Sequence, residues 1–553
     1  MKYCRLLVLT LFVYATPCFA VQMIESNPPP PGYGGGGGGP SGFNVRDIPD
    51  SPEPPASSPR RDVPQRPSTN PNGDIPPPGT PMIEVAPPNN SIHMQNDGTV
   101  MPETGGGSSS IEPSTTLLAH FNGGTATNFN PADAAGAVNS SYVISALNNR
   151  YNFYNRSGSL IKTTDGNGFL CNGPQVINGC PGTGLNPSSN KFLSIDPQIL
   201  WDSGNSRWLT SANGQVDTLF VTLNVTYVAV SQTSNPTGQW DLYYFFSCGN
   251  NSVADQPKLG IDNSLQWFFV ELSACGTTSG IPKDNLHVFY QPSLYNGTPP
   301  NSTNHFMLSD LDDLDRPAVT YSASPPFGWE FLISSGVTNG TPFENYSYIS
   351  ADASGLPVLA SNYLALSVNV APLTATYNIP AGSTPACSSC IGTIDDARIK
   401  TATVQNLSNG HPAVIAPLNF GLTNGSTQIY DVVMDISNPF SPVGAGGSHL
   451  YTNLGGTAFY ASAALTGDGN SVMLQYDFTA GPGGNGLYPS VYVFTPGAIG
   501  SFKQGVAATL VSNRWGDYTT MVPDPANAKA TWSIGSFLNS SGIQNQWWAQ
   551  VSE

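Results

Sequence analysis

Charge is scarce in this sequence of 553 residues, because Asp, Glu, Lys and Arg together make up only 10% of it. Acidic residues number 36 against 19 Lys and Arg, which gives a net charge of −17. A chain without clustered Lys and Arg lacks the surface that neutralises phosphates. After the first 20 residues, no apolar run approaches the roughly 18 residues of a membrane-spanning helix. The sequence therefore predicts no nucleic-acid partner and no transmembrane segment.

Cysteine is also rare, and six of the eight cysteines follow residue 20. In an exported chain, an even set of cysteines paired closely along the sequence is typical of disulfides. The alternative for CSSC is a redox or zinc motif, which wants a βαβ context or a second ligand pair, and neither is visible. The predicted disulfides are Cys171 with Cys180, Cys248 with Cys275, and Cys387 with Cys390.

The first 20 residues have the pattern of a secretory signal peptide. Lys2 and Arg5 precede the apolar stretch LLVLTLFVYA, and small residues stand before a cleavage point after Ala20. A lipid anchor on Cys18 is the disfavoured alternative, since Pro17 precedes it where a small residue is wanted. We expect export, with periplasmic or cell-surface retention left open.

Residues 21–114 differ in composition from the rest of the chain. Runs such as NPPPPGYGGGGGGPSG cannot bury enough apolar surface to offset chain entropy. We expect a disordered Pro/Gly-rich tether over this range.

Residues 115–553 alternate apolar and polar positions in short runs that are broken by turn residues, as in VDTLFVTLNVTYVAVSQ. No long amphipathic helix is visible. A unit of two strands and a tight turn recurs at intervals near 60 residues, often after an aspartate. Seven such units predict an all-β domain, a single seven-bladed β-propeller, with six or eight blades as alternatives.

Several of these repeats are similar to a group of secreted bacterial β-propeller proteins, some of them described as sialidase-like or glycosyl-hydrolase-like. The stretches that carry the resemblance are DPQILWDSGNSRWLTSA, ADQPKLGIDN, LYPSVYVFTPG and RWGDYTTMVPDP. The resemblance implies the propeller fold and no settled activity. This sequence also departs from the group near its C-terminal end. Where the group tends to have a segment with Tyr and Glu, this sequence has TWSIGSFLNSS, which contains no acidic residue.

The polar start of each repeat supplies the candidate site. In a propeller the first strand of each blade lines the central channel, so these starts should meet at one mouth. Crowded carboxylates raise one another's pKa unless cations or hydrogen bonds compensate. The predicted ligand-binding residues are Asp133, Asp196, Asp255, Asp315, Asp396 and Asp517, with Arg316, Arg398 and Arg514 beside them.

Three interpretations of this acidic ring remain open from the sequence. The aspartates can cap turns through nearby backbone N–H groups. They can bind calcium, for which Asp196, Asp396 and Asp517 are the proposed ligands. They can also hold a catalytic acid pair of the kind a glycosidase needs.

Other enzyme chemistry has little support in the folded region. It has six arginines and four glutamates, which is sparse for a sialidase, and no G-x-S-x-G elbow. The sequence therefore favours a monomeric, non-catalytic module that binds glycans or a surface protein, with calcium as the candidate cofactor. A glycan-active hydrolase or lyase, and an adhesive scaffold, are the alternatives.

Overall fold

The computed structural model describes about three fifths of the chain, mostly strands and the turns between them. The described residues are 43–44, 46, 61–62, 82–85, 93–96, 99–100, 115–125, 129–166, 169, 195–217, 222–246, 255–278, 281–298, 300, 303–312, 316–321, 328–338, 340–368, 375–376, 399–423, 427–437, 443–444, 449–451, 456–480, 488–495, 499–505 and 515–552.

Five blades can be recognised, and each pairs four strands antiparallel. The first three are β8 (Ala135–Val138), β9 (Tyr142–Leu147), β10 (Arg150–Asn155) and β11 (Leu160–Asp165); β12 (Ile195–Asp202), β13 (Arg207–Asp217), β14 (Thr222–Ser231) and β15 (Gln239–Phe246); and β16 (Asp255–Asp262), β17 (Trp267–Thr278), β18 (Ile281–Tyr290) and β19 (His305–Asp312). The other two are β31 (Gly456–Leu465), β32 (Val472–Ala480), β33 (Tyr488–Phe494) and β34 (Ile499–Gly505); and β35 (Thr520–Pro523), β36 (Ala530–Leu538) and β37 (Gln544–Ser552) with β6 (Thr116–Thr125).

Between β19 and β31 the strands are less regular. β20 (Arg316–Pro317) pairs with β22 (Glu330–Thr338), followed by β23 (Thr341–Ala351) and β24 (Pro357–Val368). β21 (Val319–Thr320) lies parallel to both β16 and β26 (Thr403–Asn406). The last strands of this region are β25 (Ala375–Thr376), β27 (Pro412–Leu422), β28 (Thr427–Asp435), β29 (Val443–Gly444) and β30 (His449–Tyr451). The all-β β-propeller is confirmed, and the described residues include the short helix α2 (Gln291–Tyr295), whereas seven blades stay a prediction.

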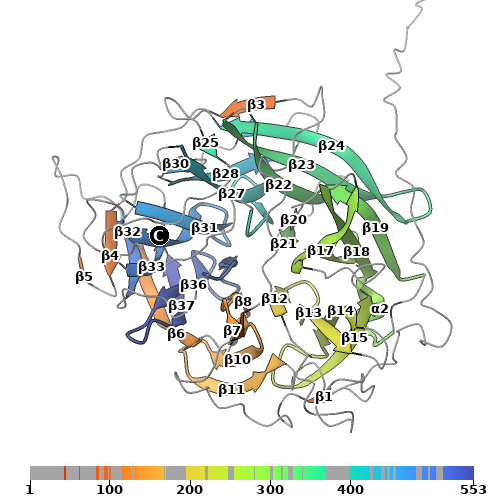
Figure 1. The fold of residues 1–553 in the computed structure, drawn as a ribbon, viewed down its shortest axis with the longest axis horizontal. Coiled ribbons are helices and arrows are strands. Elements are labelled where there is room, and N and C mark those ends of the chain that lie inside the picture. The colour runs from red at the N-terminus through yellow and green to blue at the C-terminus, as the bar shows by residue number, and fades with distance from the viewer. Residues whose placement is uncertain are drawn as a thin grey trace, which may run out of the picture.

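The blades stand around a common axis (Figure 1), with β8, β12 and β31 near it and β11 and β24 at the rim. Neighbouring blades pack face to face through apolar side chains, and glycines allow close approach at two of these contacts. A Cβ on Gly136 would lie 2.4 Å from Trp548, and one on Gly260 would lie 2.5 Å from Pro317. The indole of Trp548 also donates to Ser145 Oγ at 2.7 Å, which links the last blade to the first.

The ring is closed by pairing the two ends of the domain. β6 precedes the first blade in sequence, yet it pairs antiparallel with β37 near the C-terminus. The outermost strand of the last blade therefore comes from residues 116–125. A propeller closed in this way leaves no long unpaired edge at the junction.

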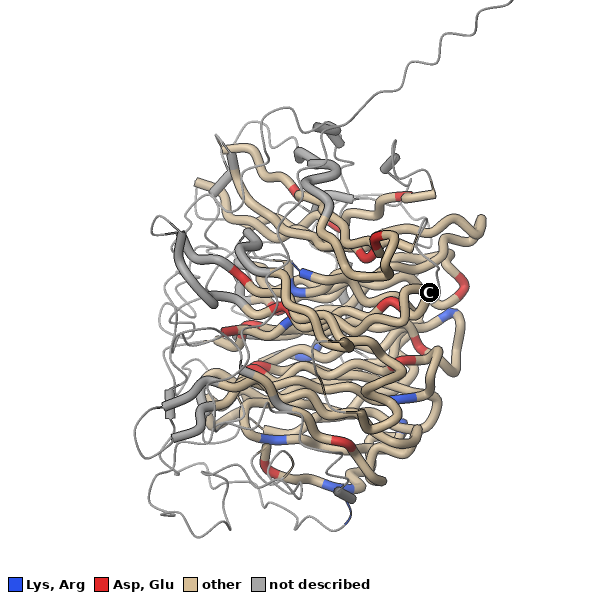
Figure 2. The backbone as a smooth tube through the Cα atoms, turned by 90° about the vertical axis from the view of Figure 1, so that its right-hand side faces the viewer, with Lys and Arg blue, Asp and Glu red and all other residues tan. Residues whose placement is uncertain are grey.

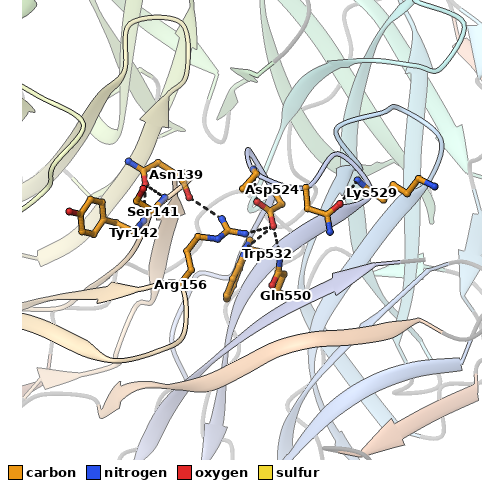
Figure 3. Close-up of polar contacts among 10 residues, drawn as sticks. Asn139, Ser141, Tyr142, Arg156, Asp524, Lys529, Trp532 and Gln550 are labelled. Carbon is orange, nitrogen blue, oxygen red and sulfur yellow. Dashed lines mark hydrogen bonds and ion pairs between the residues drawn. The ribbon is translucent and has the colours of Figure 1, made fainter.

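A polar cluster seals the same junction at the hairpin turns (Figure 3). The guanidinium of Arg156 donates to the carbonyl of Asn139 at 3.0 Å and to the carboxylate of Asp524 at 2.5 Å. Asp524 Oδ2 also accepts from Trp532 Nε1 at 3.2 Å and from Gln550 Nε2 at 2.5 Å. Because Asp524 is buried, these donors replace the water that its carboxylate would otherwise bind.

Short strands from the predicted tether lie on the outer edges of blades (Figure 1). β1 (Phe43–Asn44) pairs with β15, β3 (Met82–Val85) with β24, and β4 (His93–Asn96) with β34. β5 (Thr99–Val100) extends β4, and β2 (Arg61–Asp62) pairs with β7 (Phe129–Asn130). Disorder is thus not confirmed for these stretches of residues 21–114.

Charged positions are sparse along the described backbone (Figure 2), as the composition predicts. Within the described ranges, no helix is long and apolar enough to cross a membrane.

We expect Asp524→Ala to destabilise the domain by roughly 2 to 4 kcal/mol, because it leaves buried donors without an acceptor. Thermal unfolding of the full chain measures this as a lowered Tm. Asp468→Ala is the matched control, since Asp468 also caps a hairpin turn but keeps to local partners, Thr466 and Asn470. Equal shifts in the two variants would contradict a special role for the closure cluster.

Candidate functional site

The innermost strands begin in an uncommon backbone conformation. Asp133, Asp196, Gln256 and Tyr460 have φ angles of 47°, 52°, 41° and 53°, in the left-handed region that L-residues rarely adopt. In β12, β16 and β31 the ladder is interrupted at this place by a bulge. Bulges re-aim side chains, and such strained positions cluster at functional sites. A left-handed residue therefore recurs in these strands where polar side chains approach the axis.

The shared backbone conformation shows that one member of the predicted ring, Asp255, is one residue away from the position that Asp196 occupies in its own strand. Asp196, Gln256 and Arg316 each precede a proline and follow one another at 60-residue intervals. The counterpart of Asp196 in the next blade is thus Gln256, and Asp255 stands one position earlier. The sixth repeat, which has no acidic start, places Tyr460 at this position. The ring of strand starts is consequently mixed in character, with acidic, amide, basic and phenolic side chains.

Aspartates from separate blades nevertheless come together. The backbone N–H of Asp517 donates to Asp133 Oδ1 at 2.8 Å, although 384 residues separate the two. Asn148 bridges the first two blades, since its amide donates to Asp133 Oδ2 at 2.5 Å and its Oδ1 accepts from the N–H of Asp196 at 2.7 Å. The bonds from Asp517 to Asp133 and from Asp196 to Asn148 run between blades, so local turn capping does not account for them.

Amide and phenol groups complete the contacts of Asp517. Gln256 Nε2 lies 3.3 Å from Asp517 Oδ2, and the Tyr460 hydroxyl lies 3.2 Å from Asp517 Oδ1. The ammonium of Lys400 lies 4.5 Å from the centre of the Tyr460 ring, within reach of a cation–π interaction. Residues from strands far apart in the sequence therefore support one carboxylate.

We refer to Asp133, Asp196, Asp255, Asp517 and Tyr518 as the axial cluster. Burial raises the pKa of Asp196 well above its ordinary value, and the charges of Asp133 and Asp255 raise it further. Burial also raises the pKa of Tyr518, with additional contributions from the four aspartates around it. Burial and the neighbouring carboxylates therefore favour the protonated form of Asp196.

Exposure differs within the axial cluster. Asp133, Asp196 and Asp517 are at most 2% exposed, and Tyr518 is 3% exposed. Asp255 is half-buried. The cluster thus meets solvent on the side of Asp255.

Basic side chains lie next to the acids. Lys258 Nζ forms an ion pair with Glu271 Oε2 at 2.9 Å, and both side chains are buried. Burial lowers the pKa of the Arg316 guanidinium to about 10, and Tyr518 and Glu271 oppose that shift through their charges. Arg316 therefore lies within electrostatic reach of Tyr518, on the edge of the axial cluster.

The other predicted site residues lie outside the described residues. They are Asp315, Asp396, Arg398 and Arg514, and the same holds for Cys171, Cys180, Cys248, Cys387 and Cys390 and for the side chain of Cys275. Trp515 is described: its indole donates to Asp477 Oδ2 at 2.9 Å and packs edge-on against Phe459. Trp515 therefore packs against the β31–β34 blade.

The described part of the chain does not support the predicted calcium site. No group of three or more His, Cys, Asp and Glu side chains there is arranged to hold a metal ion. Of the predicted ligands, Asp196 and Asp517 belong to the axial cluster, whereas Asp396 lies outside the described residues.

Sequence reasoning missed the polar residues that are not aspartates. Asn148, Gln256, Tyr460 and Tyr518 all contact or influence the acids. The spacing of 60 residues and the following proline could have found Gln256 and Arg316 as counterparts of Asp196. Asn148 lies in a tight turn between β9 and β10, where no sequence signal separates it from an ordinary turn residue.

No family model and no curated protein match this chain. Solved structures do match, among them several glycoside hydrolases. An exo-β-1,3-galactanase from Phanerochaete chrysosporium, with galactose, is 12% identical over 84% of this chain and 99% of its own, with a TM-score of 0.26. An exo-1,5-α-L-arabinanase from a bovine ruminal metagenomic library is 11% identical over 61% of this chain and 99% of its own, with a TM-score of 0.27. A β-fructofuranosidase from Bombyx mori is 8% identical over 76% of this chain and 89% of its own, with a TM-score of 0.28.

These matches contradict the prediction of a non-catalytic binding module, which is corrected in favour of the hydrolase alternative. The structures found are carbohydrate-cleaving enzymes, and the prediction leaned away from an enzyme. At identities of 8% to 12% and TM-scores below 0.3, no residue role is transferred from them.

We expect Asp196→Asn to stabilise the protein increasingly as the pH rises. A carboxyl whose folded-state pKa is raised keeps its proton where the unfolded chain has lost it, so its contribution falls as pH rises above the ordinary value of 3.8. Asparagine does not titrate. The Tm difference between variant and wild type should therefore be larger at pH 7 than at pH 4.

Asp468→Asn is the control of opposite sign. Hydrogen bonds from Thr466 and Asn470 hold the pKa of Asp468 below its ordinary value, so its contribution is present above that value and lost as the pH falls. This variant should lose Tm at pH 7 and recover toward wild type in acid. Parallel pH profiles for the two variants would refute the raised pKa of Asp196.

Proposed function

We propose that the protein is a glycan-active hydrolase that works with the carboxylates of the axial cluster. The observation that carries the proposal is a buried Asp196 with a raised pKa, surrounded by three more aspartates from other blades. Glycoside hydrolysis needs a protonated carboxylic acid and an ionised carboxylate near one bond. Burial and neighbouring carboxylates favour the protonated form of Asp196, which is the form that a general acid needs.

In this proposal Asp196 is the general acid and Asp255 the general base. Asp196 donates its proton to the glycosidic oxygen as the bond to the anomeric carbon breaks. Asp255, the half-buried member of the cluster, takes a proton from water, and the hydroxyl oxygen bonds to the anomeric carbon. The overall reaction consumes one water for each bond cleaved.

The other cluster members position these two groups. Asn148 accepts from the backbone of Asp196 and donates to Asp133, which holds the two strand starts at a fixed separation. Gln256 and Tyr460 contact Asp517, so that carboxylate is held away from Asp196 by hydrogen bonds of its own. Preorganised polar groups in a buried site cost little reorganisation during the reaction.

Two finer features belong to the same proposal. We propose seven blades, because the strands between β19 and β31 supply two further groups around β22–β24 and β26–β28. We also propose that the chain is exported through its N-terminal segment, which suits an enzyme acting on extracellular glycans.

Asp196→Asn is expected to lower the rate of hydrolysis by roughly 100-fold or more, as loss of a general acid does. The measurement is the release of reducing ends from β-1,3-galactan, 1,5-α-arabinan, fructan and polygalacturonan by the full chain. Asp255→Asn should show a comparable loss, whereas the turn variant Asp468→Asn should retain the wild-type rate.

Circular dichroism and the Tm of each variant separate lost chemistry from lost folding. An active wild type whose Asp196→Asn variant keeps its rate would exclude Asp196 as the acid. A wild type that releases no reducing ends from any glycan of a broad panel would refute the proposed function.

A further inference from the structure

Arg316 is a charged group that the described structure leaves without hydrogen-bond compensation at one of its nitrogens. Its side chain is only 7% exposed, and Nη1 is buried with no hydrogen-bond partner among the described residues. Its charge-bearing neighbours are Glu271, Tyr321 and Tyr518. Of these, Glu271 is already bound to Lys258 at 2.9 Å.

Tyr518 is in the same situation. Its hydroxyl is buried and has no partner among the described residues, although four aspartates surround the ring electrostatically. Two hydrogen-bond donors of the site, one from β20 and one immediately before β35, are therefore both unsatisfied.

Such an arrangement is costly unless a ligand completes it. A buried donor without an acceptor costs about 1–3 kcal/mol, and a charged group costs more. Arg316 replaces the Asp196 and Gln256 of the preceding blades at the same position, so it is a local departure from the repeat. An anion that accepts from both donors would compensate the guanidinium and the phenol together.

We propose that Arg316 and Tyr518 receive a carboxylate of the substrate, so that the hydrolase acts on glycans containing uronic acids. This inference rests on the proposed function and specifies its substrate class. A carboxylate is favoured over a sulfate ester because the planar guanidinium fork matches two coplanar oxygens.

The placement also orients the sugar. The aspartates of the axial cluster repel an anion, whereas the positive charge of the Arg316 guanidinium attracts one. A uronate can therefore place its carboxylate at only one side of the site. Tyr518 lies within electrostatic reach of both Arg316 and Asp196, so we expect the sugar ring that carries the carboxylate to lie next to the proposed acid.

The experiment compares three trisaccharides of matched size: trigalacturonate, galactotriose and a sulfated galactotriose. Binding to the full-length Asp196→Asn variant is measured by calorimetry, so that cleavage does not intervene. We expect trigalacturonate to bind at least tenfold more tightly than galactotriose and the sulfated sugar. Arg316→Met should remove this preference, and Arg316→Lys should restore only part of it.

Stability without ligand is the second readout. Removing an uncompensated buried charge should raise the Tm of Arg316→Met, since hydrophobic replacement of buried charges is often stabilising. A structural salt-bridge partner would show the opposite change. Tyr518→Phe should weaken trigalacturonate binding and raise the Tm slightly, because it removes a buried hydroxyl that has no partner among the described residues.

The outcomes separate this inference from the proposed function. Equal binding of trigalacturonate and galactotriose, or an unchanged preference in Arg316→Met, would overturn the inference. Hydrolysis of neutral glycans alone would do the same and leave the hydrolase proposal intact. Arg316-dependent uronate binding without hydrolysis of any glycan would support the carboxylate site and refute the hydrolase. A preference for the sulfated sugar would overturn the assignment to uronic acids.

Discussion

The pairing of β6 with β37 is the interaction on which the rest of the structure depends. It joins residues 116–125 to residues near the C-terminus and so converts a row of blades into a ring. Only in a closed ring do Asp133 of the first blade and Asp517 of the last come within 2.8 Å of each other. The axial cluster is therefore a product of closure, and the Arg156–Asp524 contact on the hairpin turns secures that closure from another side of the same junction.

Bringing polar strand starts together has an electrostatic consequence. Each aspartate would keep its charge in water, but burial and its neighbours make that unfavourable at the axis. Hydrogen bonds hold the carboxylates of Asp133 and Asp517, and the raised pKa of Asp196 favours its protonated form. The left-handed backbone at Asp133 and Asp196 adds local strain of the kind that persists only when the surrounding packing enforces it. A site assembled in this way stores free energy that ligand binding can release.

Much of the fold could be predicted because local sequence patterns determine it. Alternating strands, turn residues and a period near 60 residues predict a propeller, and the hairpins of most repeats fall where expected. The register of the strand starts could not be predicted from the sequence. A bulge shifts the side-chain direction by one residue and leaves no mark in hydrophobic alternation. Asp255 was consequently equated with Asp196, although Gln256 is the structural counterpart. The short edge strands of residues 43–100 escaped prediction for another reason: their partners are rims of distant blades, which composition does not reveal.

Within the site, the sequence predicted which aspartates lie near the axis. It did not predict which of the alternative roles they have. Identifying aspartates needs only a repeat, whereas choosing among capping, metal binding and acid–base chemistry needs burial and neighbours. Asp196 and Asp468 illustrate the difference, since both are aspartates beside strands of the propeller. Burial among carboxylates raises the pKa of one, and backbone and hydroxyl donors lower the pKa of the other. Arg316 follows the same logic: its sequence position places it beside the acids, but Glu271 is paired with Lys258, and Nη1 of the guanidinium is buried with no hydrogen-bond partner among the described residues. A charge kept buried at such a cost in stability is more readily explained by what it binds than by what it supports.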